Sequence, residues 1–358
     1  MKRAILYISG FDPRGERFYK RTFRNELKKF SKITKLNCQS DSKEEGKFSL
    51  KTKNVETDLF FLSWQKIIDT IYHSSKLKFW FTSLLAIILF FSRPISIKNT
   101  CSFIIFFVMM LVVELVGLLI LLSFLLFIVI SFKIVWLIPA ISCCFLIIKI
   151  YLFIRRKITS DKIKHWVQST ISMYGYTLIK KKMFQDGAKE QLKFIQENVD
   201  FSYYDEIVVV AHSGGGYPLL FLIEILPEEI LKKIKIITMG TTIPSYVNSF
   251  HLIKTKKNIL DILQRFQVNW FDLYSPVDLI SLRMDVDSGF RNIGLKSQNA
   301  QFYKMYSDIK YSEVKKDLFS LHFHYIICGD KPINILNFYY LLTHNKPIDG
   351  YERYNEKN

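Results

Sequence analysis

The most informative feature of the sequence is a serine that ends a buried-strand pattern and directly precedes a helix pattern. In EIVVVAHSGGGYPLL, residues 206–220, the apolar run stops at Ala211, and His212, Ser213 and three glycines follow. A sharp strand-to-helix turn of this kind presents a serine hydroxyl for reaction, and small neighbours let strand and helix approach closely. The helix N-terminus also offers backbone N–H groups to a developing oxyanion. The stretch therefore predicts that Ser213 is a nucleophile.

The residues around this serine, AHSGG at 211–215, depart from the usual G-x-S-x-G pattern only at the first position, where alanine is also small. The glycines have two other interpretations, a phosphate-binding loop and a plain tight turn. Neither GxxxxGK nor GxGxxG occurs in the chain, so no motif supports nucleotide binding. The nucleophile interpretation is favoured, and the plain turn stays open as the alternative.

Two aspartates after the serine could supply the acid of a Ser, acid, His order. In WFDLYSPVDLIS, residues 270–281, Asp278 follows a strand pattern and a Ser-Pro turn. Asp272 is the alternative acid, although it lies within the strand pattern itself. A carboxylate in such a turn can also simply cap the turn or a helix. Asp278 is the predicted catalytic acid, with Asp272 as the second choice.

Two histidines follow in LFSLHFHYI, residues 318–326. If this segment is extended, His322 and His324 share one face, because side chains two residues apart point the same way in a strand. Either histidine could then reach Ser213 and act as the general base. Each could instead be a packed, aromatic-like residue beside the neighbouring aromatic side chains.

These motifs resemble the α/β-hydrolase superfamily, in which HSGGG corresponds to the nucleophile turn. The segments SGFDPRGERFYKR at 9–21, MGTTIP at 239–244 and HFHYI at 322–326 resemble a group of uncharacterised bacterial membrane-anchored predicted hydrolases. This resemblance spans most of the chain outside its apolar middle. It implies an α/β-hydrolase fold and a Ser-Asp-His triad, and it assigns the base to His322, with His324 beside it. It implies no particular substrate.

The hydrolase resemblance also implies an oxyanion donor in the loop after the first strand, SGFDPRG at 9–15. Gly10 would let this backbone approach the nucleophile, and the N–H groups of Phe11 and Gly214 are the expected donors. Many hydrolases have His-Gly where this chain has Ser-Gly, and donation from the backbone tolerates that change. Arg14 has two interpretations, a contact for an acidic group of the substrate or a surface arginine in a turn.

The middle of the chain is apolar over a length that two bilayer crossings require. Residues 102–132 contain one charged residue, Glu114, and a further apolar run follows them. A helix needs about 20 apolar residues to cross a bilayer, so the sequence predicts a transmembrane helical hairpin over roughly residues 103–129 and 134–153, with its turn near 131–133. Glu114 is either a proton or substrate site or, as we favour, a structural contact between the two helices.

Basic residues flank the predicted hairpin on both sides, with Arg93 and Lys98 before it and three at 155–157 after it. Both ends are therefore expected in the cytosol, which predicts a multi-pass protein of the inner (cytoplasmic) membrane with its catalytic domain facing the cytosol. A shorter apolar stretch, residues 79–91, is expected to be interfacial or re-entrant. A third crossing there is the alternative, and it would place the two remaining parts of the chain on opposite sides of the membrane.

The net charge of +18 fits binding to nucleic acid or to an anionic membrane surface. Much of this charge flanks the apolar segments, and no nucleic-acid motif accompanies it. Attraction to anionic lipid is the simpler account, so we expect the lipid bilayer and an ester substrate as partners, and no nucleic acid. The five cysteines have no CxxC spacing and no histidine cluster, so neither a metal nor another cofactor is expected.

Outside the apolar middle, strand and helix patterns alternate, which predicts a mostly parallel sheet with helices on both sides. The expected strands are residues 4–8, 47–51, 58–62, 206–211, 234–239 and 268–274. The expected helices are residues 16–30, 162–197 with a break near Gly187, 217–225 and 252–265. Residues 285–317 are expected to be mostly loop, and no conventional final strand is visible before His322.

The sequence therefore predicts an α/β fold, a mostly parallel sheet of α/β-hydrolase type with an inserted transmembrane hairpin. Residues 1–75 are its N-terminal part, residues 76–157 the membrane insertion with an interfacial segment and two transmembrane helices, and residues 158–358 its C-terminal part. The expected function is a membrane-anchored serine hydrolase of esterase or lipase type, with a lipid or amphipathic ester suggested by the insertion. The alternative is a non-catalytic membrane-anchored binding or scaffold protein on a hydrolase fold.

Overall fold

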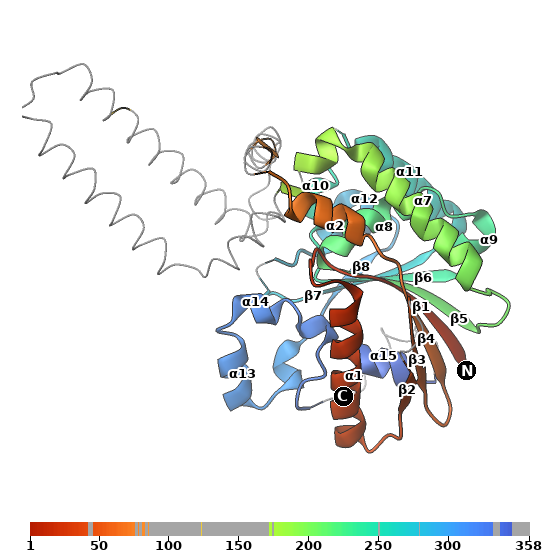
Figure 1. Ribbon diagram of the computed structural model, residues 1–358, viewed down its shortest axis with the longest axis vertical. Coiled ribbons are helices and arrows are strands. Elements are labelled where there is room, and N and C mark those ends of the chain that lie inside the picture. Colours follow the sequence, from red (N-terminus) through yellow and green to blue (C-terminus); the bar gives the residue numbers. More distant parts are fainter. Residues whose placement is uncertain are drawn as a thin grey trace, which may run out of the picture.

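A computed structural model gives the arrangement of the chain (Figure 1). The structure describes residues 1–41, 46–75, 172–173, 175–249, 251–278, 280–331 and 337–345, together with positions 78, 81–82, 85 and 123. The predicted hairpin over residues 103–153 and most of the predicted interfacial stretch lie outside these residues. In the part of the chain that is described, no helix combines the length and the apolar character that crossing a bilayer requires.

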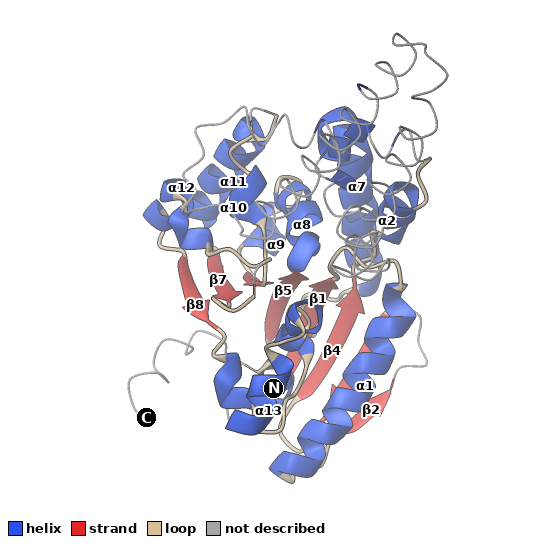
Figure 2. Cartoon of the chain, turned by 90° about the vertical axis from the view of Figure 1, so that its left-hand side faces the viewer, coloured by secondary structure: helices blue, strands red, loops and turns tan. Residues whose placement is uncertain are grey.

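The described residues form one eight-stranded sheet with the order β2-β3-β4-β1-β5-β6-β7-β8. Its strands are β1 Lys2–Ile8, β2 Gln39–Asp41, β3 Lys47–Lys51, β4 Glu56–Phe61, β5 Glu206–His212, β6 Ile234–Met239, β7 Asn269–Tyr274 and β8 Lys296–Asn299. The strands from β4 to β8 pair in parallel, whereas β2 and β3 are antiparallel at one edge. Figure 2 shows the strands side by side from β8 to β2. The predicted mostly parallel α/β sheet is confirmed.

Helices cover both faces of the sheet. They are α1 Gly15–Thr34, α2 Gln65–Tyr72, α7 Lys181–Asn198, α8 Gly216–Ile223, α9 Glu228–Leu231, α10 Ile243–Tyr246, α11 Ile253–Phe266, α12 Ser288–Asn292, α13 Asp308–Val314, α14 Leu318–Leu321 and α15 Phe338–Thr343. Short 3₁₀ turns are η3 Ser213–Gly215, η4 Met284–Val286, η5 Phe302–Met305 and η6 His324–Ile326. Figure 1 shows α2, α7, α8 and α11 on one side of the sheet and α1, α13 and α15 on the other.

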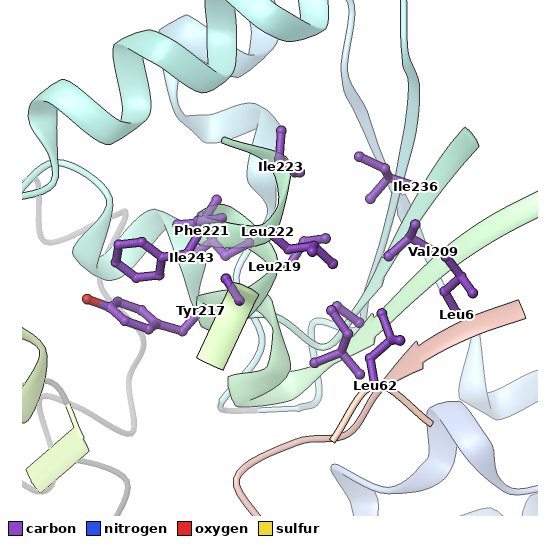
Figure 3. Close-up of a cluster of buried hydrophobic side chains, with 14 of the residues drawn as sticks. Leu6, Leu62, Val209, Tyr217, Leu219, Phe221, Leu222, Ile223, Ile236 and Ile243 are labelled. Atoms are coloured by element: carbon purple, nitrogen blue, oxygen red, sulfur yellow. The ribbon is translucent and has the colours of Figure 1, made fainter. Parts of the chain in front are cut away.

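The two faces carry separate hydrophobic cores because alternate side chains of a strand point to opposite sides. Leu6 and Val209 pack under α8, which is buried along its whole length, and Figure 3 shows this cluster. Their neighbours Ile5 and Val208 point the other way, toward α1 and α15. Burial on both faces explains why β5 is continuously apolar in sequence.

The chain order of the strands brings two loops together at one edge of the sheet. β1 lies between β4 on one side and β5 on the other, and all three are parallel. After β1 the chain continues to β2, β3 and β4 on one side, whereas after β5 it continues to β6 on the other, so the strand order reverses between β1 and β5. In sheets of this kind, ligands bind outside the carboxyl ends of the strands at such a point. The loop that begins at Ser9 and the turn that begins at Ser213 follow the carboxyl ends of these two strands.

The predicted helix break near Gly187 is wrong, because α7 runs through this position without interruption. A Cβ atom at Gly187 would lie 2.7 Å from Cδ1 of Ile67, so the missing side chain lets α7 pack closely against α2. The predicted start of this helix at residue 162 lies outside the described residues, and α7 itself begins at Lys181.

The sequence did not predict the two edge strands. β2 is fully exposed, and β8, KSQN, is only partly buried, so neither has an apolar alternation. The segment 285–317, expected to be mostly loop, contains β8 and the helices α12 and α13. β8 pairs in parallel with β7 and is the final strand before His322.

Candidate active site

The turn after β5 has the geometry that the sequence pattern predicts. β5 ends at His212, Ser213 has a φ of 55°, and η3 leads directly into α8. A positive φ is unfavourable for a residue with a side chain, and such strain is found at functional turns. A Cβ atom at Gly215 would lie 2.5 Å from the carbonyl oxygen of Ser9, so only glycine allows this close approach between the turn and the loop after β1.

The side chain of Ser213 is hydrogen-bonded to His322. The distance from Ser213 Oγ to His322 Nε2 is 2.6 Å, and that from His322 Nδ1 to Asp278 Oδ2 is 2.8 Å. All three residues are buried. Because the ionised carboxylate only accepts hydrogen bonds, the Nδ1 atom carries the proton and Nε2 accepts from the serine hydroxyl. The structure thus brings together Ser213, His322 and Asp278, which lie far apart in the sequence.

Asp278 lies in the turn after β7, as the sequence predicts. Its backbone N–H donates to the carbonyl oxygen of Ser275 over 3.1 Å, and its Oδ1 atom accepts from the N–H of Ile280 over 3.0 Å. One carboxylate oxygen is therefore held by its own turn, which leaves Oδ2 directed at His322.

Asp272, the alternative acid, lies within β7 and does not contact His322 through any hydrogen bond that the structure gives. It accepts from Thr238 Oγ1 over 2.8 Å, from Ser297 Oγ over 2.6 Å and from the N–H of Met284 over 3.0 Å. Burial raises the pKa of Asp272 to about 6. This carboxyl group joins β6, β7, β8 and η4.

The segment that carries the two histidines is not extended, so they do not share one face. His322 caps the end of α14, and His324 begins the 3₁₀ turn η6. Two residues in helical geometry point about 200° apart, so the side chains diverge. His324 Nδ1 contacts the carbonyl oxygen of Ser320 at 2.9 Å, and its ring packs 5.4 Å from the ring of Tyr306. Burial lowers the pKa of His324. The alternative base therefore points away from Ser213.

The loop after β1 lies directly against the serine turn. A Cβ atom at Gly10 would lie 3.0 Å from Cβ of Ser213, and one at Gly214 would lie 3.2 Å from the backbone nitrogen of Phe11. The indole N–H of Trp64 donates to the carbonyl oxygen of Ser9 over 2.9 Å and fixes this loop. The two predicted oxyanion donors, the N–H groups of Phe11 and Gly214, thus belong to backbone segments that touch each other.

Arg14 binds other side chains of this protein and stabilises the same loop. Its guanidinium binds both oxygens of the Asp12 carboxylate, with Nε–Oδ1 and Nη2–Oδ2 distances of 2.8 and 2.6 Å. It also lies 3.5 Å from the ring centroid of Phe18 and 5.0 Å from that of Phe323. These contacts connect the loop after β1 to the residue that follows His322.

His212 is a site residue that the sequence reasoning did not single out. Its Nε2 atom lies 3.1 Å from the carbonyl oxygen of His322, and the two imidazole rings stack with centroids 5.1 Å apart. Burial lowers the pKa of His212 to about 3. A histidine at the end of an otherwise apolar strand, directly before the serine, is the one sequence signal that could have indicated this role.

The described residues offer no group of three or more His, Cys, Asp or Glu side chains that could hold a metal ion. Of the cysteines within the described ranges, Cys38 is half-buried and Cys328 is buried, and neither forms a disulfide.

Comparison with known proteins found no matching family model, no matching curated protein and no matching solved structure. The resemblance to α/β-hydrolases that the sequence motifs suggest therefore stays a prediction.

Proposed function

We propose that this protein is a serine hydrolase of the α/β-hydrolase type that acts by acyl transfer on an ester. The observation that carries the proposal is the continuous hydrogen-bonded line from Ser213 through His322 to Asp278 at the carboxyl edge of a parallel sheet. The order of these residues in the chain, Ser, Asp, His, is the order that this fold uses.

In the proposed acylation step, Ser213 Oγ attacks the carbonyl carbon of the ester while His322 Nε2 takes the hydroxyl proton. Asp278 holds the imidazole through Nδ1–H and stabilises the imidazolium that forms. The carbonyl oxygen becomes an oxyanion, which the N–H groups of Gly214 and Phe11 stabilise. His322 then gives its proton to the alcohol as the ester bond breaks, and the acyl group stays on Ser213.

The second half of the proposed reaction uses the same groups. His322 takes a proton from water as the water oxygen attacks the acyl carbon, and the oxyanion again forms between Gly214 and Phe11. When the bond to Ser213 Oγ breaks, His322 returns the proton to that oxygen. The carboxylic acid leaves, and the enzyme returns to its resting state without any cofactor.

We further propose that the apolar residues 103–153 anchor this domain in the cytoplasmic membrane, which suggests a lipid or other amphipathic ester as substrate. Thr82 Oγ1 and Ser172 Oγ lie 2.6 Å apart, so the chain enters and leaves the apolar segment at one place, as a hairpin of two crossings would require. A tethered domain would meet its substrate at the membrane surface.

A fluorophosphonate probe, applied to membranes that contain the full chain, tests the proposed chemistry because it reacts covalently with activated serines. Wild-type protein should be labelled, and Ser213→Ala and His322→Ala variants should not. His324→Ala is the matched control, because that histidine is also buried but points away from Ser213, and it should retain labelling. Labelling that persists in Ser213→Ala would contradict the proposal. A folded wild type that resists the probe would favour the non-catalytic binding or scaffold protein.

A further inference from the structure

His212 joins the strand that bears the nucleophile to the segment that bears the proposed base. It is the last residue of β5, and its side chain is 1 % exposed. The distance from His212 Nε2 to the carbonyl oxygen of His322 is 3.1 Å. A carbonyl oxygen only accepts, so Nε2 carries the proton and donates it, and Nδ1 is the bare acceptor. Nδ1 makes no hydrogen bond within the described part of the chain.

The ring of His212 makes a second contact with His322. The two imidazoles are nearly parallel, with an interplanar angle of 29° and a centroid distance of 5.1 Å. The ring also lies 5.8 Å from Phe323 and 6.0 Å from Tyr325. One side chain therefore touches three of the four residues from 322 to 325.

His322 needs such support because no strand carries it. It lies between two short helical turns, α14 and η6, whose backbone does not pair with the sheet. Its ring nitrogens are held by side chains from two other elements, Asp278 after β7 and Ser213 after β5. The contact with His212 connects the His322 carbonyl oxygen to β5, which lies in the middle of the sheet.

We propose that His212 is a positioning residue that fixes the backbone and the ring plane of His322 for proton transfer. The proposal rests on the proposed function, since it assigns His212 a role toward that base. A displacement of about 1 Å at such a group can cost about a hundredfold in rate. The hydrogen bond and the stacked ring together restrict the position of the imidazole along two directions.

The neutral state of His212 fits this role. Burial, and the nearby charge that His322 acquires, lower the pKa of His212 to about 3. His322 becomes a cation during acyl transfer, and a second cation with its ring 5.1 Å away would oppose that step. A neutral histidine donates a hydrogen bond and provides a flat ring without this repulsion.

Three substitutions separate the hydrogen bond from the stacked ring. His212→Gln can place an amide N–H where Nε2 lies, His212→Asn has a polar group that is too short to reach, and His212→Phe keeps a flat ring without a donor. The rate of fluorophosphonate labelling of the full chain is expected to fall about ten- to hundredfold in the Asn and Phe variants. The Gln variant should recover most of the rate. Wild-type rates in His212→Phe, or a Gln variant as slow as Asn, would overturn the proposal.

A second measurement is independent of activity. In ¹⁵N-histidine-labelled protein, which contains seven histidines, the proton of His322 Nδ1–H bonded to Asp278 should give a resolved signal. This signal should weaken or shift in His212→Asn and His212→Phe and be restored in His212→Gln, at matched thermal stability. An unchanged signal in all three variants would overturn the positioning role. If the wild type shows the signal but no labelling, the proposed hydrolase function fails, and the same three variants still decide the role of His212.

Discussion

Ser213 has an unfavourable backbone conformation that its neighbours stabilise. With a φ of 55°, its conformation is about 1–2 kcal/mol less favourable than a right-handed one for a residue with a Cβ atom. The turn is held because Gly215 contacts the backbone of Ser9 and because His322 accepts the serine hydroxyl. This backbone conformation directs the Ser213 hydroxyl toward the imidazole of His322, where a nucleophile has to lie.

Asp278 should be required for reactivity through its effect on the histidine tautomer. In Asp278→Asn, the amide can donate to Nδ1, which would move the histidine proton to Nε2 and prevent that atom from accepting the serine proton. The labelling rate is expected to fall by about 10³–10⁴-fold with little loss of folded protein. Asp272→Asn, the matched control in β7, should label at a rate close to that of wild type. Equal losses in both variants would argue against Asp278 as the acid.

At the scale of the elements, Asp272 connects three neighbouring strands and makes stability depend on pH. Burial raises its pKa to about 6, whereas an exposed aspartate has a value of 3.8. The folded state then holds this proton more tightly than the unfolded chain does. The stabilising contribution of the group is therefore complete below pH 4 and is lost as pH rises through 6, by about 3 kcal/mol in total.

Denaturant unfolding of wild type and Asp272→Asn between pH 4 and pH 8 tests this dependence. The variant cannot titrate at this position, so its free energy of unfolding relative to wild type should increase by about 3 kcal/mol as the pH rises across the window. All other titrating groups are common to both proteins and cancel in the difference. A difference that stays constant with pH would contradict the raised pKa.

The packing of two glycines predicts unequal effects of the same substitution. In Gly215→Ala the new methyl group would meet the backbone oxygens of Ser9 and Ile8 at 2.5 and 2.7 Å, and backbone cannot easily move. This change should lower the free energy of unfolding by about 2 kcal/mol and slow probe labelling. In Gly187→Ala the methyl group would meet the end of the flexible Ile67 side chain, and alanine favours the helix, so stability should change by less than about 1 kcal/mol.

Thermal or denaturant unfolding of both alanine variants, with the labelling rate measured alongside, separates the two contacts. If Gly187→Ala is the more destabilised protein, this result would contradict the close packing of the serine turn against the loop after β1.

The parts of the fold that the sequence predicted are those whose burial leaves a local pattern. β5 is covered on both faces and is apolar without a break from Ile207 to Ala211, and β6 is mostly apolar and buried, so the residue pattern located both strands. β8 lies at an edge with partly exposed polar residues and leaves no such pattern. Its place depends on pairing with β7, which is a tertiary contact.

The candidate site divides in the same way. Ser213 directly follows β5 and Asp278 lies in the turn after β7, so strand and turn patterns located them. His322 lies in a short helical turn that is defined only by packing against the site. The residue pattern alone therefore left open both the local conformation and the choice between His322 and His324. The contact of His212 with the His322 backbone joins residues 110 positions apart and has no local signature.

At the scale of the whole molecule, the two halves of the chain around the apolar segment form one sheet. β1 to β4 precede that segment, β5 to β8 follow it, and β1 pairs directly with β5. Arg3 Nε also binds Glu206 Oε2 over 2.6 Å, and Lys235 Nζ binds the other oxygen over 2.9 Å, so a buried ionic group joins the halves. If the intervening residues cross a membrane, they have to cross it an even number of times.

Cysteine accessibility in a bacterial host tests this topology, in a background in which the five natural cysteines are replaced by alanine. Lys28→Cys in α1 and Lys257→Cys in α11 lie at exposed positions in the two halves. The two positions should behave alike, because one sheet cannot lie on two sides of a bilayer. The predicted cytosolic side of the sheet means that both should resist a membrane-impermeant maleimide in intact spheroplasts and react after permeabilisation. Ser131→Cys, in the predicted turn of the hairpin, should react before permeabilisation.

Each pattern of reactivity has a distinct meaning. Opposite behaviour of Lys28→Cys and Lys257→Cys would contradict the pairing of β1 with β5 and would instead fit three crossings. Protection of Ser131→Cys together with the other two would leave the sheet intact but would remove the hairpin, and with it the reason to expect a lipid or amphipathic ester. The expected pattern places the proposed Ser213 site on the cytosolic side, so its substrate has to be reached from the inner leaflet or from the cytosol.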